Sequence, residues 1–426
     1  MDNDQLISLL HSEVKPALGC TEPAAIAFTV ARARQLLEGS VTQVRVILSS
    51  NVYKNALAVC IPPVGDTGPG MAAALGLLCG KAEKGLRIFD GLSTGDFERA
   101  RQFINFGTLQ LQVAEESGLY IEANLKGPEG SASVTVKGGH TDVVKEVVNG
   151  VTVFKREVST DSPFEKIDLK TFTLQDLINA VEAFPAEKIA FLLKGIEMNL
   201  QASDRGLQMR SGLGVGAALA TLVKKGKLQN NLVSRVRVAV TGACDARMSG
   251  EDMMVMSTMG SGNQGIVATI PIAVVAAELQ AQPDKVARAL ALSHLVVAYV
   301  KQHIGKLSPI CGCAVAAGAG AAAAIAWMMG GQPGQVEGAM RNIIGNLSGM
   351  ICDGAKSGCV FKLGTSGAES IIAAELALEN VIISGNDGII SSSVEETMRN
   401  LAVLSLNGMT TTDRVILNIM LKKNAD

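Results

Sequence analysis

Aromatic residues and histidine are scarce in this sequence. Phe, Trp and Tyr together make up 4% of the 426 residues, with a single Trp, and there are only four histidines. A core with few rings has to be built from aliphatic side chains, which the 48% of hydrophobic residues can supply. No two histidines form an HExxH pattern, which argues against a zinc hydrolase.

A net charge of one sign is also missing. The 38 Lys and Arg nearly balance the 40 Asp and Glu, giving a formal charge of −2. Such a balance argues against nucleic acid or an anionic membrane surface as the main partner. The opening MDNDQLISLLHSE lacks the basic region and apolar run of a signal peptide, so we expect a cytoplasmic protein with reduced thiols.

One long apolar stretch needs an interpretation. Residues 308–331 carry no charge and have the length of a membrane span. They are mostly Ala and Gly, which partition weakly into lipid, and no basic flank orients them. A helix that is apolar all round is also typical of the centre of a large helical domain, and we favour that interpretation.

Hydrophobic periodicity divides the chain into two parts. Residues 42–49 and several segments within 108–156 alternate as strands do, with Asn149-Gly150 as the sharpest hairpin signal, whereas 51–70 looks like a loop. From 172 onward the pattern is helical, with 232–241 ambiguous between strand and helix. We therefore predict an α+β fold, in which a smaller α/β domain contains an antiparallel sheet and a mainly helical domain carries the chemistry.

The predicted domain boundaries follow from these patterns. The α/β domain covers 40–165 and the helical domain covers 166–426. Residues 1–39 contain two helices, at 4–16 and 21–38, which we expect to pack on the helical domain. Because ligand sites favour domain interfaces, we expect the active site in the cleft between the two domains.

Four of the eight cysteines lie in two short C-terminal segments. Cys352 and Cys359 flank the glycine-containing DGAKSG, and Cys311-Gly-Cys313 opens an Ala/Gly helix. Three thiolates so arranged suit a [4Fe–4S] cluster with one iron left open to substrate. The alternative is that these cysteines are small buried hydrophobic residues. Zinc is less favoured, because no CxxC pair is present.

Cys20 and two polar loops are further candidates. Cys20 directly precedes a predicted helix, whose dipole favours a thiolate, although Glu22 opposes it; an ordinary buried cysteine is the alternative. The loop at 260–265 holds Ser261 and Asn263 before an apolar helix, whose free N–H groups can bind a carboxylate. Asn51 and Lys54 follow a strand. Either loop can equally be a plain turn.

Several segments together resemble a known family. They are GCTEPAAIA at 19–27, NVYKNALAV at 51–59, DARMSGEDMMVMSTMGSGNQGI at 245–266, GKLSPICGCAVAAGAGAA at 305–322 and MICDGAKSGCVFKLGTSGAES at 350–370. They resemble the L-cysteine desulfidase family, which is related to the alpha chain of iron–sulfur L-serine dehydratases. The resemblance implies a lyase that needs no pyridoxal phosphate and converts L-cysteine to hydrogen sulfide, pyruvate and ammonia on a [4Fe–4S] cluster.

The resemblance also implies roles for individual residues. It assigns the base to Cys20 and the cluster ligands to Cys352, Cys359 and either Cys311 or Cys313. We prefer Cys311, because it stands in the loop before the helix. The Ser-Ser-Ser-His-Thr loop and the longer ligand spacing of serine dehydratases are absent, which weakens serine as substrate.

Two alternatives remain for the function. One is an L-serine or other hydroxy-amino-acid dehydratase on the same cluster, and the other is a protein that binds an amino acid without turnover. In each case the expected partner is a small amino acid, with a homodimer left open as the assembly.

Overall fold

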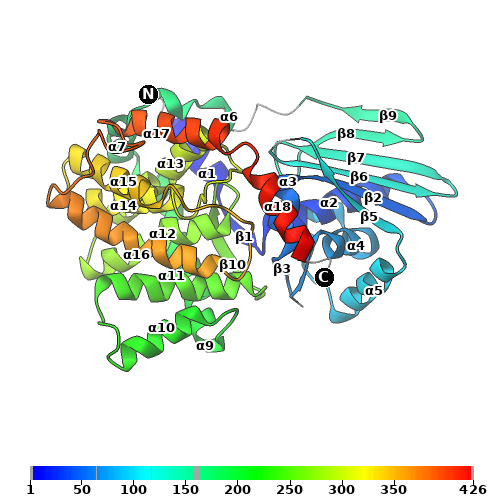
Figure 1. Cartoon of the computed structure of the whole chain (residues 1–426), viewed down its shortest axis with the longest axis horizontal. Coiled ribbons are helices and arrows are strands. Elements are labelled where there is room, and N and C mark those ends of the chain that lie inside the picture. The colour runs from blue at the N-terminus through cyan, green and yellow to red at the C-terminus, as the bar shows by residue number, and fades with distance from the viewer. Residues whose placement is uncertain (1–2, 64, 117, 158–162, 424–426) are drawn as a thin grey trace.

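The computed structural model describes residues 3–63, 65–116, 118–157 and 163–423. Most helices gather on one side of the molecule, and a six-stranded sheet with its covering helices forms the other (Figure 1). The predicted α+β fold is confirmed. Two separate clusters of buried hydrophobic residues underlie the two parts, which we call the helical part and the sheet part.

The sheet is mixed rather than antiparallel throughout. Its strands, in spatial order, are β5 (Leu109–Ala114), β2 (Gln43–Ser49), β6 (Tyr120–Gly127), β7 (Gly130–Lys137), β8 (Val143–Val148) and β9 (Val151–Lys155). β2 pairs in parallel with β5, and the other neighbours are antiparallel. The parallel pair arises because the chain crosses over through helices between β2 and β5. Asn149 and Gly150, both with positive φ, form the predicted hairpin turn between β8 and β9.

One face of the sheet is buried under helices. In β6, Ile121, Ala123 and Leu125 are fully buried and alternate with partly exposed Glu122 and Asn124. The helices on the buried face are α2 (Thr21–Leu36) and α4 (Pro69–Cys79), and α5 (Thr94–Asn105) packs on α4. This face therefore forms the core of the sheet part.

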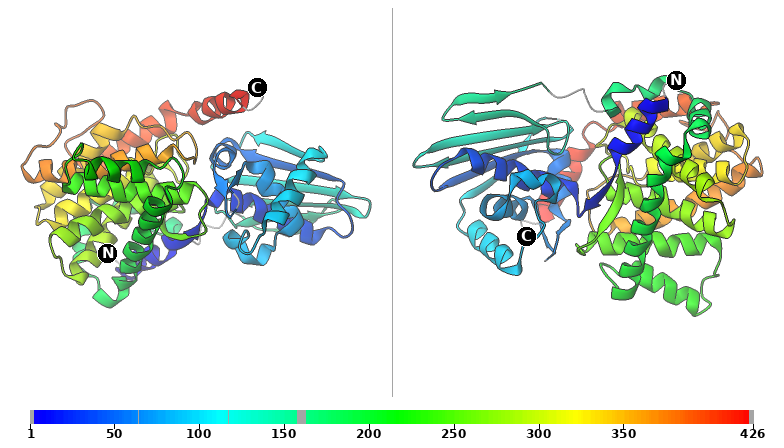
Figure 2. Two further views of the ribbon diagram at one scale, coloured as in Figure 1. Left: turned by 90° about the horizontal axis from the view of Figure 1, so that it is seen from below. Right: turned by 180° about the vertical axis from the view of Figure 1, so that it is seen from behind.

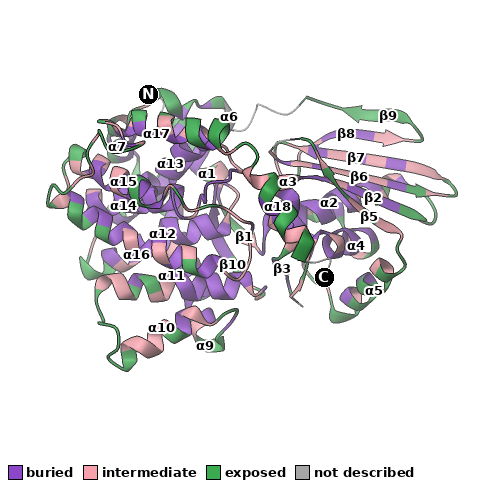
Figure 3. Cartoon of the chain, viewed as in Figure 1, coloured by how far each residue is buried: buried purple, intermediate pink, exposed green. Residues whose placement is uncertain are grey.

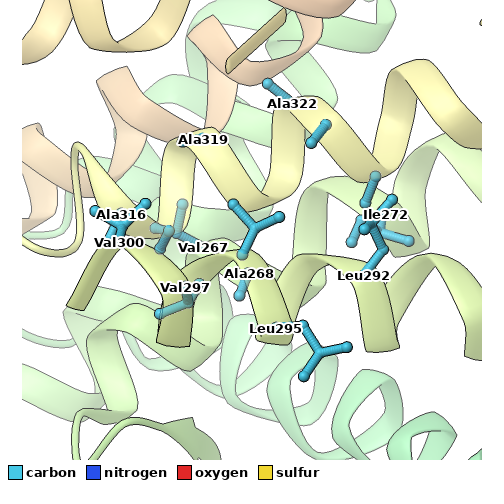
Figure 4. Close-up of a cluster of buried hydrophobic side chains, with 14 of the residues drawn as sticks. Val267, Ala268, Ile272, Leu292, Leu295, Val297, Val300, Ala316, Ala319 and Ala322 are labelled. Atoms are coloured by element: carbon cyan, nitrogen blue, oxygen red, sulfur yellow. The ribbon is translucent and has the colours of Figure 1, made fainter. Parts of the chain in front are cut away.

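The helical part is built around two central helices, α13 (Pro283–Ile304) and α14 (Ala316–Met328), which are buried along most of their length (Figure 3). Figure 4 shows alanines of α14 such as Ala319 and Ala322 in the same buried cluster as branched side chains of α13 such as Val297. The uncharged stretch 308–331 is thus a core helix with its flanks. Among the residues that the structure describes, no helix has the length and apolarity needed to cross a membrane.

The remaining helices surround this pair. They are α1 (Asn3–Glu13), α6 (Pro163–Lys166), α7 (Leu174–Ala183), α8 (Ala186–Ile189), α9 (Leu193–Met209), α10 (Val215–Lys224), α11 (Leu232–Met248), α12 (Gly262–Glu278), α15 (Pro333–Leu347), α16 (Cys359–Leu378) and α17 (Val394–Val403). The segment that was ambiguous, 232–241, is part of helix α11.

We predicted that both N-terminal helices pack on the helical part, and only one of them does. α1 does, but α2 belongs to the core of the sheet part. The reason is that α2 is apolar on nearly all sides and the sheet offers it a bare apolar face. Residues 14–16 are not the end of a helix either. They lie in strand β1 (Val14–Leu18), which pairs antiparallel with β10 (Met254–Thr258) in the helical part.

Two further elements differ from the sequence-based expectation. The stretch predicted as a loop after β2 contains helix α3 (Ser50–Leu57), followed by the short strands β3 (Cys60–Ile61) and β4 (Asp66–Thr67). The last helix, α18 (Thr412–Lys423), leaves the helical part and packs on α3 (Figures 1 and 2). Its Leu417 is buried in the core of the sheet part, so the chain end returns across the boundary.

Candidate functional site

A cavity of about 790 Å³ lies between the helical part and the sheet part. Residues from both parts line it, at the place where the sequence led us to expect an active site. The eight residues singled out from the sequence all line this one cavity: Cys20, Asn51, Lys54, Ser261, Asn263, Cys311, Cys352 and Cys359. Cys313 lines it as well.

A pairing of two loops brings Cys311 and Cys352 together. The Cys311 N–H donates to the Met350 carbonyl at 2.8 Å, and the Cys352 N–H donates to the Pro309 carbonyl at 2.7 Å. Between them Ile310 and Ile351 form an isolated antiparallel bridge. Two cysteines 41 positions apart in sequence are thus held on adjacent backbones.

Cys359 stands at the start of α16, after the turn that begins at Cys352. Its sulfur lies 3.6 Å from the Gly354 carbonyl oxygen, which it can approach as a donor. Burial raises the pKa of Cys359 and of Cys352, and the charges of the neighbouring cysteines raise each further. That mutual effect shows that the sulfurs are close enough to repel one another as thiolates.

Cys311 differs from the other three. The Cys313 thiol donates a hydrogen bond to its sulfur, and this contact, with backbone N–H groups, lowers the pKa of Cys311 in spite of burial. The pKa of Cys313 is correspondingly raised. Of the two, Cys311 is therefore the one favoured as a thiolate.

Cations surround the cysteine cluster. Lys54 and Lys362 lie close enough to lower the pKa of Cys352, and Lys301, which is 2% exposed, is stabilised as a cation by the charges of Cys352, Cys313 and Cys311. Burial nevertheless lowers the pKa of Lys301 to about 8. The positive charges would offset part of the negative charge of a thiolate-bound group.

These residues fit a thiolate-held iron–sulfur cluster. Four thiols converge from two paired loops and one helix start, next to three lysines. Among the residues described, no three His, Cys, Asp or Glu side chains are arranged to hold one metal ion. In a [4Fe–4S] cluster each cysteine thiolate binds a different iron, so the sulfurs do not have to converge on one point as they do around a single ion.

Cys20 lines the same cavity from the start of α2, close enough to Cys359 for the two charges to interact. It is the N-cap residue of α2, follows Gly19 at φ 63°, and is 6% exposed. Burial raises the pKa of its thiol to about 11, although Arg247 acts against it. The thiolate that the helix start was expected to favour is therefore not the resting form at neutral pH, because desolvation outweighs the helix dipole.

Arg247 ties Cys20 to the loop before α12. This buried arginine at the end of α11 donates to the Gly19 carbonyl at 2.7 Å and to Asn263 Oδ1 at 2.9 Å. Its Nε is buried and has no hydrogen-bond partner in the part of the chain that the structure describes. The sequence-based reasoning missed Arg247, because α11 carries further charged residues at Arg235, Arg237 and Asp245 and nothing in the sequence distinguishes this one.

The start of α12 presents polar groups to the cavity, as predicted for the loop at 260–265. Ser261 caps the helix, with its Oγ accepting from the Gln264 N–H at 3.3 Å. Gln264 is 6% exposed, and its Oε1 is buried with no hydrogen-bond partner among the residues that the structure describes. Asn263, by contrast, is held in place by Arg247. Ser261 and Gln264 are thus the side chains here with hydrogen-bonding capacity left for a ligand.

Two residues of the sheet part complete the polar lining. Glu22, on the first turn of α2, accepts hydrogen bonds from Asn55 Nδ2 at 3.0 Å and from Thr21 Oγ1 at 3.1 Å. His140, on the turn between β7 and β8, also lines the cavity. The sequence-based reasoning did not select His140.

Lys54 lines the cavity with its ammonium group already engaged. Its Nζ lies 2.5 Å from Asp413 Oδ1 and donates to the Cys352 carbonyl at 2.8 Å. Asn51, one turn earlier on α3, carries no such restraint among the described hydrogen bonds. The two residues predicted for substrate binding on this segment therefore differ in what they have free to offer.

Comparison with known proteins places the chain in a family. The sequence model for the serine dehydratase alpha chain matches residues 83–418, which include the paired cysteine loops and most of the cavity lining. The chain belongs to the serine dehydratase alpha chain family. Most of the residues that line the cavity therefore lie in the part of the chain that this family model matches.

Relatives that span the whole chain carry a less specific name. A UPF0597 protein of Clostridium botulinum strain Langeland is 39% identical over 423 residues, covering 99% of this chain and 98% of its own length. UPF0597 proteins of Clostridium tetani and of Caldanaerobacter subterraneus subsp. tengcongensis are 40% and 39% identical over 421 residues, each covering 98% of both chains. The similarity thus runs over nearly the full length of both chains rather than over one shared segment.

Proposed function

We propose that this protein is a lyase that eliminates hydrogen sulfide from L-cysteine and so releases pyruvate and ammonia. One observation carries the proposal: four cysteines from separate segments line one interdomain cavity that also holds polar groups suited to an amino acid. The family, named for a lyase of a β-substituted amino acid, supports the reaction class. The choice of cysteine rests on the sequence resemblance described above.

The proposed cofactor is a [4Fe–4S] cluster held by Cys311, Cys352 and Cys359. When bound, a cluster with one iron free of protein ligands supplies a Lewis acid, and a soft one, for a departing thiolate. The chain's contribution is to fix the three thiols on rigid backbone and to surround them with Lys54, Lys301 and Lys362.

The polar end of the cavity would orient the amino acid. The start of α12 offers N–H groups to the substrate carboxylate, with Ser261 and Gln264 beside them. Glu22 can accept from the substrate ammonium, and Asn51 lies on the same wall. Lys54 and Asn263 then act as positioning residues, because Asp413 and Arg247 respectively hold their polar groups.

The elimination balances without an outside oxidant or reductant. A base takes the Cα proton, the electron pair of that bond forms the Cα–Cβ double bond, and the Cβ–S bond breaks with its electrons going to sulfur. The aminoacrylate that leaves the site tautomerises and adds water, giving pyruvate and ammonia. General-base catalysis contributes about 10²–10⁴-fold, so substrate positioning has to supply much of the remaining rate enhancement.

Serine dehydration on the same cysteines is the rival within the enzymes. The test is anaerobic purification, with iron and sulfide counted, followed by parallel pyruvate assays on L-cysteine and L-serine. We expect about four irons per chain and a kcat/KM for L-cysteine well above that for L-serine. A preference for L-serine would replace the proposed substrate and keep the reaction class.

A binding protein without turnover is the rival from another class. Iron-loaded protein that binds L-cysteine or L-serine, measured by calorimetry under nitrogen, yet forms no pyruvate would support that rival and sink the lyase. Cys79→Ser serves as the matched control in these assays, because Cys79 lies on α4 and does not line the cavity.

A further inference from the structure

His140 reaches the cavity from the sheet part. It follows Gly138 and Gly139 in the connection from β7 to β8 and is partly exposed towards the cavity. Its ring rests on Gly260: a Cβ added to that glycine would lie 3.4 Å from His140 Cε1 and 3.9 Å from Nδ1. The imidazole therefore crosses the boundary between the two parts and lies over the turn that begins α12.

The imidazole has hydrogen-bonding capacity that the protein does not use. Its Nε2 is buried and has no hydrogen-bond partner among the described residues. Every neutral imidazole keeps one nitrogen as an acceptor, and the other donates. A buried polar atom without a partner costs free energy, so a ligand group that reaches Nε2 would gain a hydrogen bond that the described residues do not supply.

Charged groups from three elements bear on this ring. Glu22 comes from the first turn of α2, Lys306 from the segment after α13, and Asp142 from the ring's own loop. Burial is the largest effect and lowers the pKa of His140; Lys306 acts in the same direction, while Glu22 and Asp142 act against it. The neutral form is thus present at neutral pH, and two carboxylates are at hand to stabilise a cation formed during reaction.

Resting on the elimination proposed above, we propose that His140 is the catalytic base that accepts the Cα proton of the bound amino acid. The Cα–H bond breaks, its electron pair forms the Cα–Cβ double bond, and the proton moves to the imidazole, giving an imidazolium beside Glu22 and Asp142. The imidazolium then returns its proton to the hydrosulfide that has left Cβ, so that hydrogen sulfide departs and the base is regenerated.

This assignment differs from the one that the resemblance gives to Cys20. Cys20 would first have to lose its own proton in a desolvated position next to Glu22, which opposes a second negative charge. A neutral imidazole needs no such step. Both side chains line the same cavity, so the two assignments can be separated by matched variants.

The first experiment compares His140→Asn with Cys20→Ala in the cluster-loaded protein. We expect His140→Asn to lower kcat by about 10²–10⁴-fold with unchanged iron content, and Cys20→Ala to lower it much less. In the wild type the acidic limb of the kcat/KM profile should follow a single group, and it should disappear from the residual activity of His140→Asn. His11→Asn is the control, since His11 is exposed and stacks on Phe191 away from the cavity.

A second measurement separates catalysis from a structural role. Added imidazole should raise the activity of His140→Gly at least tenfold. With [2-²H]-L-cysteine, both the rescued variant and the wild type should show a primary isotope effect on kcat/KM. Absence of rescue, together with turnover of His140→Asn within fivefold of wild type, would overturn the role of His140. If Cys20→Ala instead carries the large loss, Cys20 is the base. A wild type that forms no pyruvate from any amino acid overturns the lyase itself, which is a separate result.

Discussion

An ion pair between Lys54 and Asp413 joins helix α3 to the last described helix, α18, beside the cysteine cluster. Lys54, which is 1% exposed on α3, places its Nζ 2.5 Å from Oδ1 of Asp413 in the first turn of α18. The same ammonium donates to the carbonyl of Cys352 at 2.8 Å. One buried cation thus fastens the last helix, the sheet part and a cysteine-bearing loop to one another.

Removing the partner of this cation should destabilise the protein. Asp413→Asn leaves the Lys54 charge without its carboxylate, and we expect the free energy of unfolding to fall by about 2 kcal/mol, a figure kept modest because Asp413 is 15% exposed. Lys54→Met with Asp413→Leu should recover most of this loss in urea unfolding. Asp284→Asn, which breaks an exposed pair with Arg288 on α13, should change stability by less than about 0.5 kcal/mol. Equal losses in both single variants would contradict the special role of Lys54.

Gly354 brings the cysteine loop against α3. It has φ 88°, and a Cβ there would lie 2.4 Å from the carbonyl oxygen of Lys54. Gly354→Ala should therefore cost about 3 kcal/mol through backbone strain and a clash that no flexible side chain can relieve. Gly349→Ala is the matched control, because no atom lies within 4 Å of its Cβ position. Thermal unfolding of the two variants side by side distinguishes this contact from a general intolerance of alanine in the loops.

The four cavity cysteines should differ in their effect on iron. Ser at Cys311, Cys352 or Cys359 should abolish iron binding and the broad visible absorbance, whereas Cys313→Ser should keep most of the iron, since Cys313 donates to Cys311 rather than carrying the favoured thiolate. Iron and sulfide content of anaerobically prepared protein measures this. Full iron in Cys311→Ser with loss in Cys313→Ser would exchange their assignments.

Strong periodicity made much of the fold predictable. The alternation in 108–156, the helix at 21–38 and the helical pattern from 172 onward follow from local patterns that tertiary contacts reinforce. β1 and β10 were missed because each is five residues long and gains its hydrogen bonds only from a partner about 240 positions away. The location of α2 was also out of reach, because a helix that is apolar on most sides does not indicate which surface covers it.

The site was predictable where residues carry their own chemistry. Cys352 and Cys359 are conspicuous by spacing, and the structure places both in the cavity. Arg247 and His140 gave no comparable signal, because their roles depend on residues that are distant in the sequence. Arg247 binds Gly19 and Asn263, and His140 lies against Gly260. The predicted ionisation of Cys20 failed for the same reason, since the burial that raises its pKa comes from residues far away in the chain.

Arg247→Lys should weaken the link between the Cys20 turn and the start of α12. A lysine can reach only one of the two acceptors, so the other buried oxygen is left unpaired at a cost of about 1–3 kcal/mol. KM for the amino acid should rise more than kcat falls, because Asn263 and the turn lose their restraint. Arg237→Lys, an exposed change on the same helix, should leave both stability and kinetics within error. A normal KM in Arg247→Lys would remove this arginine from substrate positioning.

His294 should make the helical part sensitive to acid. It is 2% exposed in α13, its Nδ1 has no described partner, and burial lowers its pKa from 6.5 to about 4. Between these two pH values the unfolded chain binds a proton that the folded chain does not, so stability that is fully present above pH 6.5 is lost as the pH falls towards 4, by about 3 kcal/mol in all. Urea unfolding followed by the fluorescence of Trp327, the single tryptophan, on the neighbouring helix α14, reports this part directly. His294→Leu should be at least as stable as the wild type at pH 7, and its free energy of unfolding should fall by about 3 kcal/mol less on going to pH 4. The control is His11→Gln, an exposed change that should follow the wild type. Parallel curves of unfolding free energy against pH for all three proteins would show that His294 is not the titrating group.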